Sequence, residues 1–179
     1  MKKACGVFIL ILFLLVSAKT SSAQTVEGKR FEFSTSASMW NVKYRWSTET
    51  RTVFNVPVRI GFFLFKGLEI EPEVFLTIPE DSDYTGILFL GNLVYNFKAS
   101  KKAIPFILGG FGIGNGLQEF SVAEDWGESV TALNFGAGIK FLVGSSAALR
   151  IEYRFTKYWE AGEYLRTDNN IYVGFSVFF

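Results

Sequence analysis

The feature that most constrains this chain is a two-residue alternation of apolar and polar side chains. Between residues 52 and 64 the even positions are mostly apolar, and the odd positions include Arg59. After Lys66 and Gly67 the alternation resumes over residues 68–78. A period of two is that of a β-strand, and the short break with a glycine is typical of a hairpin turn.

The first 23 residues differ from the rest. Lys2 and Lys3 precede an apolar stretch at 7–16, and small residues follow at 21–23. This order predicts a signal peptide over 1–23, because its apolar part is too short for a spanning helix. Residues 24–179 contain no apolar run of 18 residues, so a helical membrane protein is excluded and one β-barrel domain is expected over 24–179.

Eight strands are predicted, and the connections between them alternate in length. The strands are expected near 29–40, 52–64, 68–78, 84–97, 103–114, 129–143, 147–157 and 169–179. Short connections are expected near 65–67, 98–102 and 144–146, and mostly longer ones near 41–51, 79–83, 115–128 and 158–168. This pattern predicts an all-β, eight-stranded antiparallel up-and-down transmembrane β-barrel, with short turns at one rim and longer loops at the other.

Two irregularities interrupt the alternation. The apolar phase of the first strand changes between Met39 and Trp40, which predicts either a bulge or a change of surroundings above the membrane. Pro57, Pro72 and Pro105 fall inside predicted strands, where each lacks a backbone donor. We expect bulges or missing hydrogen bonds there.

The charged residues of the two-faced strands share one phase. They are Arg59, Glu69, Glu71, Glu73, Lys140, Arg150, Glu152 and Arg154. An unpaired charge in hydrocarbon would cost several kcal/mol, so this phase must face away from lipid, into the barrel. Small residues in the same phase, such as Gly61 and Gly138, would leave room for the long side chains.

Aromatic residues gather at the predicted rims. Trp40, Trp46, Trp126 and Trp159 fall near the long loops, with Tyr158 beside them. Amphipathic rings favour the level of the lipid headgroups, so an aromatic girdle is predicted at this rim.

The last segment places apolar side chains on one face and ends on an aromatic residue. Phe175, Val177 and Phe179 share that face. With the stretches 104–112 and 149–155, this segment resembles the small bacterial outer-membrane barrels of the OmpA-like and OmpX-like kind. The resemblance implies export to the Gram-negative outer membrane, and it implies that these three residues form the signal presented to the barrel-assembly machinery. Unlike OmpA, no peptidoglycan-binding domain is expected after the barrel.

The sequence offers little for catalysis. It has no histidine, the commonest general base, and its only cysteine, Cys5, lies in the predicted signal peptide. The glycines of 109–114 lie in an apolar strand with no helix after them, so they do not predict a nucleotide site. No enzyme activity, cofactor, metal or nucleic-acid binding is expected.

Two interpretations of the interior charges stay open. They could pair with one another in a filled barrel, or they could line a narrow conduction path. The carboxylates of Glu69, Glu71 and Glu73 could also hold a cation, but salt bridges to the interior arginines explain them at lower energetic cost. The loop 118–128 mixes acidic and aromatic residues, which suits contact with an extracellular partner or with lipopolysaccharide through a divalent ion.

The sequence therefore predicts a non-enzymatic outer-membrane barrel with a structural or surface-interaction role, such as adhesion or envelope integrity. A narrow porin for small solutes is the first alternative. A soluble lipocalin-like carrier with an apolar interior is the second.

Overall fold

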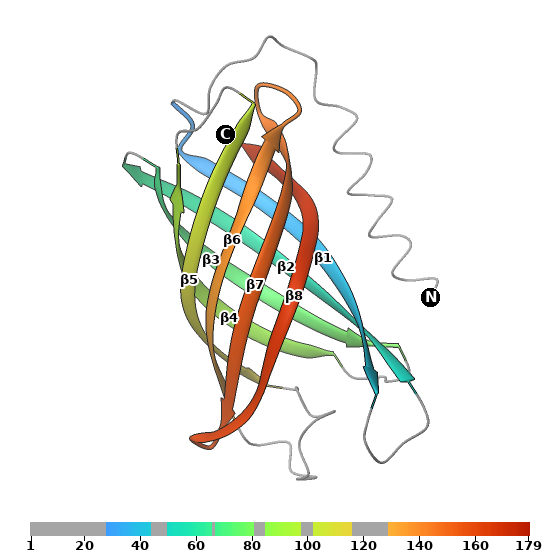
Figure 1. Ribbon diagram of the computed structural model, residues 1–179. Helices are drawn as coiled ribbons and strands as arrows, with labels where there is room; N and C mark the ends of the chain where they lie inside the picture. The colour runs from blue at the N-terminus through green and yellow to red at the C-terminus, as the bar shows by residue number, and fades with distance from the viewer. Residues whose placement is uncertain (1–27, 44–49, 66, 81–84, 98–101, 116–128) are drawn as a thin grey trace.

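Eight antiparallel strands close into a barrel (Figure 1). The computed structural model describes residues 28–43, 50–65, 67–80, 85–97, 102–115 and 129–179, so the predicted signal peptide lies outside the described residues. The strands are β1 (Phe31–Lys43), β2 (Thr50–Phe65), β3 (Leu68–Pro79), β4 (Gly86–Asn96), β5 (Ala103–Asn115), β6 (Val130–Leu142), β7 (Ala147–Glu160) and β8 (Glu163–Phe178). The predicted fold class is confirmed.

Within the described ranges, no helix is long and apolar enough to cross a membrane.

One predicted connection is wrong. Residues 158–168 were expected to form a longer loop, but β7 and β8 continue to Glu160 and from Glu163. Only Ala161 and Gly162 join them, with φ angles of 48° and 85°. Positive φ at both central residues is typical of the tight hairpin turn that matches strand twist. The β7–β8 hairpin therefore extends beyond the predicted strand ends, at the rim opposite the end of β8 (Figure 1).

The strands present two chemically different faces. In β3 and β4, buried and exposed residues alternate along the whole element. Large apolar side chains such as Phe33, Phe89 and Ile171 are exposed on the outer wall, whereas Arg59 and Glu71 are buried inside. An apolar wall around a polar interior is the arrangement of a transmembrane barrel and the reverse of a lipocalin-like carrier.

The prolines interrupt pairing locally. The β1–β2 register is constant, but no pair forms where Pro57 lies opposite Ser36. The β2–β3 register likewise skips the positions around Pro72. Pro105 lies where the β4–β5 ladder ends, and its carbonyl accepts a hydrogen bond from Phe97 N–H at 2.8 Å.

No bulge separates Met39 from Trp40. The two residues pair with Phe54 and Val53 in the unbroken β1–β2 register. Trp40 lies on the inner face, opposite the fully buried Val53. The change of phase therefore reflects an apolar side chain, Trp40, on the inner face of the barrel.

The seam between β1 and β8 is short. Pairing runs only from Glu32↔Phe178 to Ala37↔Val173, although both strands continue toward the loop rim. The two strands diverge there (Figure 1). Beyond the last pair, the Arg166 guanidinium lies 5.7 Å from the centre of the Trp40 ring, so side chains meet where the ladder has ended.

Inward-facing glycines make room for large neighbours. A Cβ at Gly138 would lie 2.5 Å from Phe106 Cζ and 2.4 Å from the Ile151 carbonyl oxygen. Gly91 faces outward, with nothing within 4 Å of the same position.

We expect Gly138→Ala to lower the free energy of unfolding by about 1–3 kcal/mol, because the Phe106 ring and the β7 backbone must both move. Gly91→Ala is the matched control and should change it by less than about 0.5 kcal/mol. Urea unfolding in detergent or lipid vesicles measures both. Equal effects of the two substitutions would contradict this account of Gly138.

Candidate functional site: the charged interior

The structure brings all eight sequence-predicted charged residues together inside the barrel. Arg59, Glu69, Glu71, Glu73, Lys140, Arg150, Glu152 and Arg154 are each at most 3% exposed. They come from β2, β3, β6 and β7, where alternation directs them to the inner face. We call these eight residues, together with Glu32, the interior charge network.

Lys140 organises the end of the network nearest the short turns. Its ammonium donates hydrogen bonds to Glu32 and, at 3.2 Å, to Glu69. Three phenylalanine rings surround the same ammonium, with centres 5.3–5.9 Å away; they belong to Phe63, Phe106 and Phe178. The charge is therefore held by carboxylates and by aromatic faces.

Arg150 connects opposite sides of the barrel. From β7, its Nη1 and Nη2 donate to the two carboxylate oxygens of Glu71 on β3, at 2.6 and 3.2 Å. Its Nε donates to Glu152 at 3.0 Å. A bidentate arginine–carboxylate pair is among the strongest and most directional of protein ion pairs.

The next layer toward the loops contains two further arginines. Arg154 donates to Glu73 at 2.6 Å and to Glu152 at 2.7 Å. Arg59 donates to Glu73 at 3.0 Å and to Ser36 at 2.9 Å. Glu73 and Glu152 each therefore accept from more than one arginine, which joins the pairs into one network.

Sequence reasoning missed Glu32. It is 1% exposed and shares Lys140 with Glu69. The signal was present, because Glu32 stands between the apolar Phe31 and Phe33 at the start of the first alternating strand. With Glu32, the interior charge network has five carboxylates and four basic groups.

Polar and apolar groups fill the interior beyond the charges. Asn134 on β6 donates to Asn92 on β4 at 3.0 Å, across β5, and Asn92 donates to Glu73 at 2.8 Å. Toward the loop rim, the Phe75 ring of β3 meets Tyr172 of β8 edge to face at 6.2 Å. Buried apolar side chains pack around this pair; they are Leu88, Leu90, Val130, Ala132 and Tyr158.

The acidic cluster at the turn end has the spacing of a cation site. Carboxylate oxygens of Glu32, Glu69 and Glu71 all lie within 4.8 Å of one another. However, Lys140 and Arg150 bind these same carboxylates. The protein's own ammonium and guanidinium groups thus supply the positive charge that a metal ion would bring.

The predicted assembly residues lie on the outer wall. Phe175 and Phe179 are 36% and 63% exposed, and Val177 shares their outward phase on β8.

The predicted girdle is only partly correct within the described residues. Trp159 lies at the loop rim, where the Lys157 ammonium is 5.1 Å from its ring centre. Trp40 and Tyr158 face the interior instead. Trp46 and Trp126 lie outside the described residues.

Arg150→Met should lower the free energy of unfolding by about 3–5 kcal/mol, because Glu71 and Glu152 lose a buried partner. The double variant Arg150→Met/Glu71→Leu should be closer to wild type, since it removes both charges of the pair. Glu163→Gln, at an exposed position, is the control. Urea unfolding in vesicles measures all three. A double variant with a lower free energy of unfolding than Arg150→Met would contradict the pairing of Arg150 with Glu71.

Comparisons with known proteins agree with this geometry. The outer membrane protein beta-barrel domain family matches residues 8–179. No curated protein matches the sequence. Among solved structures, the chain is similar to Neisserial surface protein A, at 12% identity and TM-score 0.58, covering 83% of this chain and 95% of that one. It is also similar to the N-terminal barrel domain of Pseudomonas aeruginosa OprF, at 15% identity and TM-score 0.55, covering 85% and 98%.

These two likenesses show the fold, and the family match covers nearly the whole chain. The apolar outer wall is what a barrel in contact with lipid requires. The chain therefore belongs to the outer membrane protein beta-barrel domain family and resides in the outer membrane.

Proposed function

We propose that this outer-membrane barrel is a non-enzymatic scaffold that acts structurally or presents its loops to a partner outside the cell. The observation that carries the proposal is the set of side-chain contacts across the barrel interior. Arg150 and Arg154 of β7 reach Glu71 and Glu73 of β3, and Phe75 of β3 reaches Tyr172 of β8.

These contacts occupy the space that a solute would need. An eight-stranded barrel is just wide enough for its own side chains. Here ion pairs fill the half near the short turns, and apolar side chains together with buried polar ones such as Asn55 and Thr77 fill the half near the loops. Permeation would require breaking several buried ion pairs at once, which opposes the alternative of a narrow porin.

In planar bilayers the wild-type protein should give no stable conductance steps. The porin alternative predicts steps whose ion selectivity changes when Glu71→Gln removes an interior charge. Gly91→Ala, on the outer wall, is the control for altered insertion. A stable selective current in wild type that changes with Glu71→Gln would reject the closed scaffold.

The loops would then carry the contact with a partner. The connection between β5 and β6 is the longest at the loop rim, and it contains Glu119, Glu124, Asp125 and Glu128 with Phe120 and Trp126. Such a mixture suits a protein partner or lipopolysaccharide bridged by divalent cations.

We also propose that Phe175, Val177 and Phe179 are recognised by the barrel-assembly machinery during insertion.

Replacing residues 118–128 with a Gly-Ser linker of equal length should abolish surface binding while the barrel still folds. Binding of expressing cells to host cells or matrix measures the first effect, and heat-modifiable gel mobility measures the second. Replacing residues 81–84 with a Gly-Ser linker of equal length is the control. Unchanged adhesion in the first variant would show that this loop does not make the contact.

A further inference from the structure

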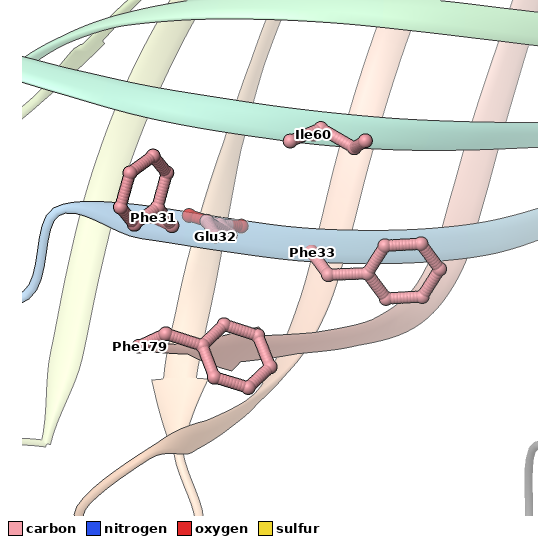
Figure 2. Close-up of a pocket in the computed structure, with 5 residues that line it drawn as sticks. All are labelled: Phe31, Glu32, Phe33, Ile60 and Phe179. Atoms are coloured by element: carbon pink, nitrogen blue, oxygen red, sulfur yellow. The ribbon is translucent and has the colours of Figure 1, made fainter.

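An apolar groove lies on the outer wall near the short-turn rim, where β1, β2 and β8 meet (Figure 2). Its volume is about 300 Å³. Phe31 and Phe33 of β1, Ile60 of β2 and Phe179 after β8 supply its side chains. Glu32 contributes to the floor, while its carboxylate binds Lys140 inside the barrel.

Backbone hydrogen bonds fix the walls of this groove. Arg30 N–H donates to the Phe179 carbonyl at 2.8 Å, and Phe179 N–H donates to Phe31 at 2.9 Å. Phe63 N–H donates to the Arg30 carbonyl at 3.0 Å. Arg30 is thus tied to β2 and to the end of β8, directly beside the groove, and Lys29 precedes it.

The two rims of the barrel differ in charge. The connections at the groove rim are 66–67, 97–102 and 143–146. With residues 28–30 they contain basic and no acidic side chains, and Glu27 stands immediately before them; the basic residues are Lys29, Arg30, Lys66, Lys98, Lys101 and Lys102. The connections at the other rim are 44–49, 80–85, 116–129 and 161–162. Arg45 is their only basic residue, against Glu49, Glu80, Asp81, Asp83, Glu119, Glu124, Asp125 and Glu128.

From this charge pattern and the groove, we propose that the barrel binds an anionic glycerophospholipid of the periplasmic leaflet. One acyl chain lies between Phe31, Phe33 and Phe179, and the phosphate lies against Lys29 and Arg30. The longest connection, between β5 and β6, is at the other rim, which places the groove rim at the periplasmic side. Aromatic and aliphatic walls match a hydrocarbon chain, and basic residues at the membrane surface attract anionic headgroups.

The groove and the basic pair have separable effects on binding. Each basic residue near an anionic headgroup contributes about fivefold in affinity, so Lys29 and Arg30 together contribute about 25-fold. This contribution is larger for an anionic lipid than for a zwitterionic one, whose choline cation offsets the charge of the same phosphate. The apolar groove contributes to both lipids alike, because both carry the same acyl chains.

The test uses the full protein in a non-ionic detergent, with native mass spectrometry reporting bound lipid. Phosphatidylglycerol and phosphatidylcholine with identical acyl chains are added separately. Wild type should retain one phosphatidylglycerol and bind it more tightly than phosphatidylcholine. Lys29→Ala/Arg30→Ala should weaken phosphatidylglycerol about 25-fold and phosphatidylcholine by much less, because choline offsets the charge of its phosphate.

Two control variants locate the effect. Lys101→Ala/Lys102→Ala removes the same number of charges from the same rim, on the connection into β5, and should leave phosphatidylglycerol binding near wild type. Phe33→Ala should weaken both lipids, whereas Phe89→Ala, outward on β4, should weaken neither. Heat-modifiable gel mobility confirms that every variant is folded.

Three results would overturn the proposal. The first is equal loss of phosphatidylglycerol in the two lysine-containing double variants, which would indicate general attraction to a basic rim. The second is equal affinity of wild type for the two lipids. The third is a dimer of the chain that Phe33→Ala dissociates, which would make a second copy the occupant of the groove.

Discussion

The structure depends on pairing buried charges across the barrel. Five carboxylates and four basic groups of the interior charge network are shielded from water, and each would be costly alone. The strands of one wall place them within reach of partners on the other, as with Arg150 and Glu71 at 2.6 Å. Because the outer wall faces lipid, where a charged side chain is costly, these residues cannot turn outward. The interior contacts therefore fix both the filling of the barrel and the register in which its strands must close.

The distribution of charged and apolar side chains between the two faces of each strand could be predicted from the sequence. A side chain in a strand can point to only one of two faces, and successive side chains alternate between them. Arg59, Glu71 and Arg150 had to share a face, and an apolar opposite face had to meet either a core or a lipid. The number of strands and the inward phase of the charged residues followed from that rule. Glu32 obeys it too, since it lies between two outward phenylalanines, and it could have been included.

Other features could not be predicted because they depend on distant parts of the chain. Which carboxylate each arginine binds is set by register across the barrel, as when Arg154 of β7 reaches Glu73 of β3. The tight turn at Ala161 and Gly162 was missed because polar residues such as Glu160, Glu163 and Arg166 suggest a loop. Those residues extend the hairpin beyond the apolar wall, where a polar strand face is favourable. The inward position of Trp40 likewise depends on Val53, its partner in β2.

The abbreviated β1–β8 ladder has a mechanical consequence. Seven interfaces of the wall are held along most of their length, while the eighth is held by backbone bonds only near the periplasmic side. Thermal widening of the cylinder must therefore concentrate along one line, at the level of the outer leaflet. Strain from a pulled or crowded loop would be relieved there first, where the Arg166 guanidinium lies 5.7 Å from the centre of the Trp40 ring and bridges the two strands.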